Sequence, residues 1–357
     1  MALRRVTADD VLARWADFDN IIDARSESEF ALDHLPGALN WPSLNDAERT
    51  LVGTQYKQAS PFEARKQGAV LVARNIAGHI ERELTQTARD WRPLVYCWRG
   101  GQRSGALATV LDHIGFHVHV LEGGYREFRR AVRGQLESLP AGLNLVAVCG
   151  RTGSGKSRLL HALAKAGAQV LDLEDLASHR GSVLGPLPDR PQPSQKAFET
   201  LVWQALRSFD PAQPVYVESE SRTIGRLRVP EALLLRLRAS VCVQLQMPLQ
   251  ARVAFLLEDY VHFVDDVNSF CLRLDALREV CGALAVDGWQ LQARSGQIAA
   301  VVQSLLTQHY DPIYMRSMQR NFSKFSVAQV LEVANGDPHT LATAALRLLH
   351  ADTLAGA

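Results

Sequence analysis

Residues 143–165 have the sequence LNLVAVCGRTGSGKSRLLHALAK, which decides the fold of the second half of the chain. The apolar run Leu143–Cys149 predicts a buried strand, and Lys156–Lys165 carries apolar residues at helical spacing. Between them, Gly150-Arg151-Thr152-Gly153-Ser154-Gly155-Lys156-Ser157 matches the P-loop pattern G-x4-G-K-S. Glycines let backbone N–H groups turn toward a phosphate, which Lys156 would reach, and Ser157 would hold Mg²⁺ if the site uses a metal. This order of elements predicts an α/β domain that binds phosphate groups.

The ligand of this P-loop is left open by the neighbouring residues. P-loop NTPases hold their metal near an acidic residue at the end of a buried strand, and the predicted strand Pro214–Glu218 ends in Glu instead of the usual Asp. Asp172 and Glu174, after the predicted strand 168–172, resemble the kinase-like members of the class. For Asp172 and Glu218, a solvated strand end is the alternative. The sequence supports binding of a diphosphate and does not choose a nucleotide.

A second anion-binding loop precedes the first in the chain. Cys97-Trp98-Arg99-Gly100-Gly101-Gln102-Arg103-Ser104 joins a predicted strand, 94–97, to a predicted helix, 104–115. Loop amides and a helix N-terminus favour a thiolate over a thiol, whose ordinary pKa is about 8.5. Such a cradle also binds tetrahedral oxyanions. We therefore predict a reactive thiol at Cys97; the alternative, a buried core cysteine, leaves the flanking Arg-Gly-Gly-Gln-Arg unexplained.

Composition is that of an ordinary globular protein. The chain has 357 residues, 47% hydrophobic and 22% charged, with a formal charge of +1. This balance argues against coating nucleic acid by bulk charge but allows a local basic patch. The sequence contains neither an apolar run long enough to span a membrane nor a signal peptide at its start, so we expect a cytoplasmic protein without a membrane partner. Five cysteines without a C-x-x-C pair indicate neither a disulfide framework nor zinc, and Cys149, Cys242 and Cys271 are expected in the core.

The pattern of apolar segments predicts three regions. Residues 1–138 alternate short strands (20–24, 94–97 and 117–121) with helices, which predicts an α/β domain with a mainly parallel sheet. Leu139-Pro140-Ala141-Gly142 is a plausible boundary. Residues 139–250 form the P-loop α/β domain, and residues 251–357 are expected to be a helical C-terminal region packed on it.

The first region resembles the rhodanese domain. Asp23-Ala-Arg-Ser-Glu-Ser-Glu-Phe30 and His34-Leu-Pro-Gly-Ala-Leu-Asn40 are similar to the early signature of that family, and Cys97 falls at its sulfur-carrying cysteine. Rhodaneses usually place the loop arginine five residues after the cysteine, whereas Arg103 is six after Cys97. The longer C-x5-R loop is similar to that of phosphatases with the same fold. It suggests a ligand larger than a bare sulfane sulfur.

The ordered pair of loops resembles the bacterial tRNA 2-selenouridine synthase family, in which a rhodanese domain is fused to a P-loop domain. The resemblance extends through Val52–Lys57, Asp172–Ser182 and Glu218–Gly225, and covers most of residues 10–260. It implies a transferase acting on wobble 2-thiouridine of tRNA. In that family geranyl diphosphate first alkylates the sulfur, and selenium from selenophosphate then replaces the S-geranyl group. The implied partners are tRNA and a selenophosphate-producing enzyme.

On this resemblance Gly150–Ser157 is assigned to geranyl diphosphate and the loop at Cys97 to selenophosphate. The residues assigned with Cys97 are Arg99, Gly100, Gly101, Gln102, Arg103 and Ser104. A covalent Cys–Se adduct is favoured over simple assistance by the thiol. Other candidates for substrate contact or support are Asp172, Glu174, His179, Arg180, Glu218, Glu220 and Arg222. Candidates for tRNA binding are Arg226, Arg228, Arg316, Arg320 and Lys324, for which a solvated helix face is the alternative. A prenyl groove could use Trp203, Phe255, Tyr260 and Phe263, for which core packing is the alternative.

Three rival functions remain open at this stage. A rhodanese-type sulfurtransferase with a regulatory P-loop NTPase domain would consume thiosulfate with cyanide and hydrolyse ATP without tRNA. A cysteine phosphatase is favoured by C-x5-R, but no Asp or Glu lies between Cys97 and Ser104 to act as general acid. A module that only senses phosphorylated ligands would keep its function when Cys97 is replaced by Ser.

Overall fold

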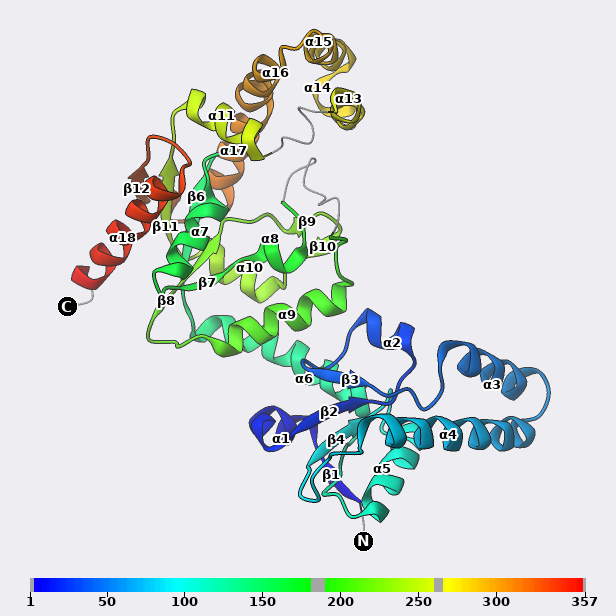
Figure 1. Ribbon diagram of the computed structural model, residues 1–357. Helices are drawn as coiled ribbons and strands as arrows, with labels where there is room; N and C mark the ends of the chain where they lie inside the picture. The colour runs from blue at the N-terminus through cyan, green and yellow to red at the C-terminus, as the bar shows by residue number, and fades with distance from the viewer. Residues whose placement is uncertain (1–2, 181–189, 260–265, 356–357) are drawn as a thin grey trace. The chain divides into compact units, whose positions relative to one another are not determined.

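The computed structural model describes residues 3–180, 190–259 and 266–355 (Figure 1). The chain divides into two compact units, each described here by itself. The first unit comprises Met1–Gln135 with Pro193–Gln204, and the second comprises Leu136–Gln192 with Ala205–Ala357. The sequence assigned residues 193–204 to the P-loop domain, whereas the structure groups them with the first unit. The reason is a set of buried polar contacts with the first unit: Thr200 hydrogen-bonds to Asp33 and Arg129, and Glu199 pairs with Arg129.

The first unit contains a five-stranded sheet with the order β1-β5-β4-β2-β3, and every neighbouring pair is parallel. Its strands are β1 Arg4–Val6, β2 Asn20–Asp23, β3 Ala38–Asn40, β4 Pro93–Tyr96 and β5 His119–Leu121. The central strand β4 is buried along its whole length, as expected for a parallel sheet covered on both faces. The predicted parallel α/β fold of this region is confirmed.

Helices connect and cover these strands. They are α1 Ala8–Ala13, α2 Glu27–Leu32, α3 Asp46–Gln58, α4 Pro61–Glu83, α5 Gln102–Ile114 and α6 Gly124–Ser138, with 3₁₀ turns at Trp15–Asp17 and Leu139–Gly142. The core joins apolar side chains of β2, β4 and β5 to Leu107 and Leu111 of α5. Because α5 is held in this core, its N-terminus lies directly beyond the end of β4.

The second unit contains another five-stranded parallel sheet, with the order β12-β11-β6-β8-β7. Its strands are β6 Asn144–Gly150, β7 Gln169–Leu171, β8 Pro214–Glu218, β11 Val241–Gln246 and β12 Gln329–Glu332, and a short pair is formed by β9 Thr223–Ile224 and β10 Leu227–Arg228. In open parallel sheets, ligands bind beyond the carboxyl ends of the strands. The P-loop lies at that end of β6.

The helices of this unit fall into two groups. Those that alternate with the strands are α7 Lys156–Lys165, α8 Leu173–Ala177, the end of α9 Gln195–Ser208 that follows Gln204, α10 Glu231–Arg238 and α11 Leu249–Asp259. Those that follow are α13 Val267–Asp275, α14 Arg278–Cys281, α15 Ala283–Arg294, α16 Ile298–Ser304, the π-helix η3 Leu305–Tyr310, α17 Asp311–Asn321, the 3₁₀ helix η4 Phe325–Val327 and α18 Pro338–Ala355. Among the described helices, none is both long and apolar enough to cross a bilayer.

The C-terminal region differs from the expectation of an entirely helical segment. Strand β12 pairs in parallel with β11, from Val243 opposite Gln329 to Gln246 opposite Glu332. Only Leu331 of this four-residue edge strand is buried, so its pattern is too short for a periodicity signal. Leu331 and Leu341 join the same core as β6 and α7, and so the tail completes the sheet of the second unit.

Candidate functional site

The Cys97 thiol lies in the gap between the end of β4 and the start of α5. Its Sγ accepts hydrogen bonds from the Gly101 amide at 3.3 Å and from the Ser104 hydroxyl at 3.1 Å, and Cys97 is 3% exposed. Burial by itself raises the pKa of Cys97. Hydrogen bonds from the Ser104 hydroxyl and from the amides of Ser104, Arg99 and Gly101 outweigh burial and lower this pKa below the usual thiol value. The loop therefore favours the thiolate, as predicted from its sequence.

Gly124, which sequence reasoning missed, is required by the backbone of this loop. Gly124 has φ of +61°, and a Cβ there would lie 2.1 Å from the Cys97 carbonyl oxygen and 2.5 Å from the Gly100 amide nitrogen. Such contacts exclude every other residue type. The available signal was the dipeptide Gly123-Gly124 directly after strand β5. It lies outside the loop motif but closes around it.

Arg103, one of the residues assigned to the anion loop, forms an ion pair with a carboxylate of another helix. The Arg103 guanidinium donates to Glu29 Oε2 at 2.7 Å, and Arg49 lies 3.2 Å from the same oxygen. Arg99 and Gln102 are exposed, while Ser104 is buried against the sulfur. The loop thus stabilises its thiolate mainly with N–H and O–H dipoles, while the Arg103 guanidinium is tied to Glu29.

The P-loop begins at the end of β6 and leads directly into α7. Gly153 and Gly155 have φ of +78° and +82°, in the left-handed region that lets this backbone turn toward a phosphate. The Lys156 ammonium lies 3.1 Å from Glu218 Oε1, and the Ser157 hydroxyl donates to Glu218 Oε2 at 3.2 Å. Strand β8 carries Glu218, so the end of this strand contacts the P-loop, and Glu218 is buried there instead of lying at a solvated strand end.

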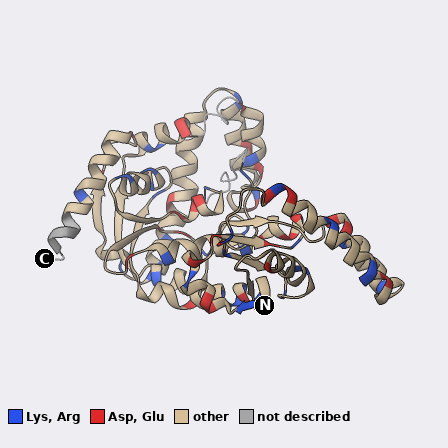
Figure 2. Ribbon diagram, turned by 60° about the horizontal axis from the view of Figure 1, so that its bottom comes forward, with Lys and Arg blue, Asp and Glu red and all other residues tan. Residues whose placement is uncertain are grey.

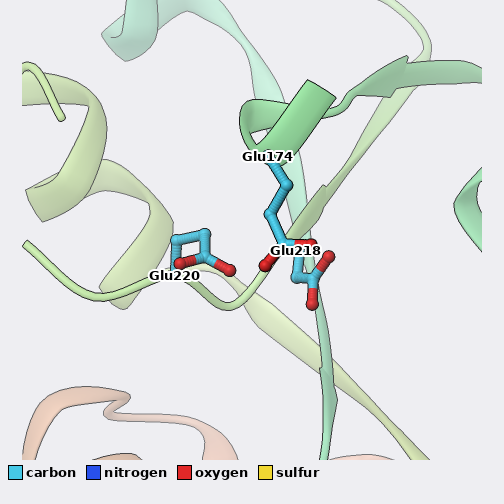
Figure 3. A group of neighbouring side chains, drawn as sticks. All are labelled: Glu174, Glu218 and Glu220. Carbon is cyan, nitrogen blue, oxygen red and sulfur yellow. The ribbon is translucent and has the colours of Figure 1, made fainter. Parts of the chain in front are cut away.

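Three carboxylates, Glu174, Glu218 and Glu220, form a cluster beside the P-loop (Figure 3). They come from α8, the end of β8 and the segment after β8, and their ligand oxygens lie within 4.8 Å of one another. Burial, together with the charge of Glu218, raises the pKa of both Glu174 and Glu220 above the usual range. Burial lowers the pKa of Lys156, but Glu218, Tyr314, Glu174 and Glu220 together outweigh burial and raise it. The raised pKa values favour the protonated, neutral forms of Glu174 and Glu220, so Lys156 faces mainly the charge of Glu218.

Buried side chains from the C-terminal helices hold the P-loop in place, and sequence reasoning missed them. The Tyr314 hydroxyl accepts from the Gly150 amide at 2.7 Å and lies 3.1 Å from the Ser219 hydroxyl. Arg252, 2% exposed, donates to the Thr152 carbonyl at 2.9 Å and forms two hydrogen bonds to Asp311, at 2.9 and 2.7 Å. The helical region is therefore part of the phosphate site.

A cavity of about 850 Å³ opens beside the P-loop, and its wall has two chemical characters. Its charged and polar lining includes Lys156, Ser157, the carboxylate cluster, Asp172, His179 and Arg180. Its apolar and aromatic lining includes Phe255, Leu256, Tyr310, Ile313, Tyr314, Met318 and Phe322. Such a cavity suits a ligand with an anionic head and an apolar tail.

The remaining predicted residues divide between the cavity and the surface. Asp172 caps α8 by accepting from the Asp175 amide at 2.8 Å, and burial raises its pKa. Arg180 donates to the Asp259 carbonyl at 3.1 Å, so it is anchored at the cavity wall. His179 is buried, and burial lowers its pKa. Arg222 is exposed and lies 4.0 Å from Glu231.

Of the four side chains predicted for a prenyl groove, Phe255 lies in the cavity wall. Trp203 instead packs in the first unit. Its ring centroid lies 5.6 Å from that of Phe128 and 6.3 Å from that of Trp15. Tyr260 and Phe263 lie outside the described residues. The C-terminal helix α17 supplies apolar wall residues that the sequence did not indicate for this purpose.

The predicted tRNA-binding residues are all exposed, in two separate stretches of sequence: Arg226 and Arg228, and then Arg316, Arg320 and Lys324. Arg226 donates to the Gln192 carbonyl and Arg316 to the Pro312 carbonyl, at 2.7 and 3.2 Å. Figure 2 shows Lys and Arg interspersed with Asp and Glu over the described chain. Their distribution agrees with the formal charge of +1.

These two units define a class of protein in which a rhodanese-like domain with a thiol loop is fused to a P-loop domain. A family model described as "Rhodanese-like domain" matches residues 7–131, and one described as "tRNA 2-selenouridine synthase AAA domain" matches residues 143–275. The chain belongs to the tRNA 2-selenouridine synthase family, as its sequence motifs predicted.

Named relatives agree with this assignment. A tRNA 2-selenouridine synthase from Nitrosomonas europaea is 36% identical over 257 residues, which cover 71% of this chain and 66% of the relative. One from Alcanivorax borkumensis is 32% identical over 343 residues, which cover 87% of this chain and 92% of the relative. Among solved structures, the N-terminal domain of a putative ATP/GTP binding protein from Clostridium difficile 630 is 30% identical, with a TM-score of 0.31, and the match covers 37% of this chain and 98% of that one.

Proposed function

We propose that this protein is a tRNA-modifying transferase that converts wobble 2-thiouridine to 2-selenouridine through an S-geranyl intermediate. The observation that carries the proposal is the pairing of a thiolate-stabilising loop at Cys97 with a P-loop cavity that is charged on one side and apolar on the other. The relatives named tRNA 2-selenouridine synthase support it.

Geranyl diphosphate has the two characters of the P-loop cavity. Its diphosphate would lie against the P-loop amides and Lys156, and its ten-carbon chain against the apolar wall of α11 and α17, including Leu256, Ile313 and Met318. The thiouridine sulfur attacks the carbon that bears the diphosphate, the carbon–oxygen bond breaks, and N3 of the base loses its proton. Lys156 stabilises the charge that develops on the departing diphosphate.

The carboxylate cluster suits a divalent cation that would accompany the diphosphate. Carboxylates and the Ser157 hydroxyl are hard oxygen donors of the kind that Mg²⁺ takes, and the oxygens of Glu174, Glu218 and Glu220 already lie within 4.8 Å of one another. A bound Mg²⁺ would neutralise the repulsion between these carboxylates and an anionic ligand. We therefore expect S-geranylation to require Mg²⁺ and to stop on addition of EDTA, while alkylation of Cys97 by iodoacetamide continues unchanged.

Selenium transfer is assigned to the loop around Cys97. Selenium bonds to C2 of the base as the C2–S bond breaks and geranyl thiol leaves, and water takes the phosphoryl group of selenophosphate as phosphate, so no oxidant or reductant is needed. We place Cys97 in direct contact with the selenium donor. A covalent role in which the Cys97 thiolate takes the phosphoryl group while selenide leaves needs no oxidant, and it predicts that the intact protein gains the mass of a phosphoryl group after incubation with selenophosphate alone.

The central test uses the full chain with tRNA that carries wobble 2-thiouridine, supplied with geranyl diphosphate alone, selenophosphate alone or both. Mass spectrometry of digested nucleosides should detect S-geranyl-2-thiouridine in the first reaction and 2-selenouridine in the third. A protein that forms neither nucleoside, yet transfers sulfur from thiosulfate to cyanide and hydrolyses ATP without tRNA, would instead be the rhodanese-type sulfurtransferase with a regulatory NTPase domain. A selenophosphate-producing enzyme is the expected supplier of the second substrate.

A further inference from the structure

The segment Pro193–Gln204 is held in the first unit by buried polar contacts. The Thr200 hydroxyl donates to Asp33 Oδ2 at 3.1 Å and accepts from Arg129 Nη1 at 2.8 Å. Arg129 also forms an ion pair with Glu199, and the Ser194 hydroxyl donates to the Leu32 carbonyl. Buried charged groups linked in this way fix the segment in register, because losing one partner leaves another unsatisfied. The first half of α9 is therefore a fixed part of the unit that contains Cys97.

This fixed helix places Lys196 beside the loop around Cys97. The Lys196 ammonium lies 5.6 Å from the centroid of the Trp98 ring, and Trp98 is the residue next to Cys97. The Tyr125 ring, with its centroid 5.4 Å from that of Trp98, supports the indole within the same unit. A cation at this distance from an aromatic face is attracted to it, which orients a flexible lysine. Lys196 follows Cys97 by 99 positions, so no loop motif could indicate it.

The charges around the loop show why this lysine matters. The Arg103 guanidinium is tied to Glu29 at 2.7 Å, a carboxylate that it shares with Arg49 at 3.2 Å. Among the described residues, Lys196 has no ion pair, and neither does Arg99 of the loop. Both side chains are exposed. A multiply charged anion entering the loop would meet these two cations rather than Arg103.

We propose that Lys196 is a substrate-binding residue of the Cys97 loop, where its ammonium contributes the positive charge that holds a tetrahedral anionic chalcogen donor. The identity of that donor as selenophosphate rests on the proposed function, whereas the existence of the anion site does not. The side chain releases Trp98 or slides along it to reach the anion, while the buried contacts of Thr200 keep the helix in place. In this way a segment from the sequence of the P-loop domain completes the site of the rhodanese-like unit.

The test compares Lys196→Gln and Lys196→Arg with a matched control, Lys66→Gln. Lys66 is also an exposed lysine of the first unit; its ammonium lies 5.2 Å from the Phe62 ring centroid and pairs with Glu63, both residues of its own helix α4 and neither of them in the loop. Inorganic phosphate and thiosulfate are used without tRNA to protect Cys97 from iodoacetamide, measured on the Cys97 peptide by mass spectrometry. We expect Lys196→Gln to weaken protection about fivefold, as for loss of one partly exposed charge, with Lys196→Arg and Lys66→Gln close to wild type.

A second readout separates donor binding from RNA binding. With selenophosphate and S-geranylated tRNA, Lys196→Gln should raise the KM for selenophosphate by a similar factor and leave kcat and tRNA affinity within about twofold. Unchanged protection in Lys196→Gln, absence of protection in the wild type, or weakened tRNA binding with unchanged protection would each overturn the proposal. The protection assay needs neither tRNA nor a prenyl donor. A failure of the proposed function would therefore appear in the selenation assay alone, and a failure of the Lys196 proposal would appear in the protection assay.

Discussion

The two anion-binding loops differ in the origin of the groups that support them. At Cys97 the donors to the sulfur, Gly101 and Ser104, come from the loop itself, within seven positions. At the P-loop, Gly150 is bonded to a tyrosine 164 positions away, and Thr152 to an arginine 100 positions away. One loop tunes its nucleophile locally, whereas the other depends on a helical region that is remote in sequence. The loops should therefore respond differently to substitution.

The largest effect should follow from Cys97→Ser. Loss of the thiolate should reduce formation of 2-selenouridine by roughly a thousandfold or more, because groups that act directly on the reacting atoms have effects of this order. S-geranylation at the P-loop should continue at the wild-type rate. Nucleoside mass spectrometry measures both products, and Cys281→Ser is the matched control. Normal 2-selenouridine from Cys97→Ser would remove the thiol from the mechanism.

Lys156→Ala should have the opposite effect from Cys97→Ser: it should impair S-geranylation and leave selenation intact. S-geranylation should fall by about a hundred- to a thousandfold, the usual loss when one group that stabilises a developing anion is removed. Selenation of tRNA that already carries S-geranyl-2-thiouridine should be retained. Lys165→Ala, at the exposed end of the same helix, serves as control. Equal impairment of both steps would contradict the assignment of one step to each loop.

Tyr314→Phe tests the dependence of the P-loop on its remote support. The change leaves the Gly150 amide without its acceptor, which should lower the free energy of unfolding by about 1–3 kcal/mol and raise the KM for geranyl diphosphate. Urea unfolding measures the first effect, with Tyr56→Phe on an exposed helix as a control. The alkylation rate of Cys97 should stay at the wild-type value. A changed rate would mean that the two loops are coupled.

The smallest effect concerns the pH dependence of the local loop. Only the thiolate reacts with iodoacetamide, so the reactivity of a cysteine is lost as the pH falls through the pKa of its thiol in the folded protein. The pKa of Cys97 is lowered by its hydrogen bonds, whereas burial raises the pKa of Cys281. The pH midpoint for Cys97 should therefore lie below the ordinary value of about 8.5 and that for Cys281 above it. Ser104→Ala should move the Cys97 midpoint upward, and an unmoved midpoint would contradict the local origin of the shift.

Much of the fold could be predicted because its signals are short in sequence. The P-loop, the thiol loop and most strands of both parallel sheets depend on apolar runs and glycines within a few residues. Strands β1, β3 and β12, of three or four residues each, escaped prediction because such short runs give no clear periodicity; in β12 only Leu331 is buried. Residues 193–204 escaped it because the polar partners Asp33 and Arg129 lie in a distant part of the chain.

The candidate site shows the same difference between features encoded by short motifs and features that depend on distant residues. Arg103 was assigned to the anion loop together with Arg99 and the loop amides, and the structure shows that its side chain pairs with Glu29 of another helix. Arg252, Asp311 and Tyr314 lie on helices whose periodicity identifies a buried face but not the loop that the face contacts. Their hydrogen bonds to the P-loop became visible only when the helices were in place.

The sequence by itself determined the two parallel sheets, the thiol and phosphate loops at their strand ends, and membership of the tRNA 2-selenouridine synthase family. Those features follow from local backbone preferences and from residue types at fixed spacing. Only the tertiary structure decided which cationic side chains pair with a carboxylate and which do not. Arg103 pairs with Glu29, whereas Lys196 lies over the Trp98 ring and forms no ion pair among the described residues. It also decided that α11 and α17 form the apolar wall of the P-loop cavity. The reason is physical: electrostatic and packing energies depend on distance in space, which distance along the chain does not specify.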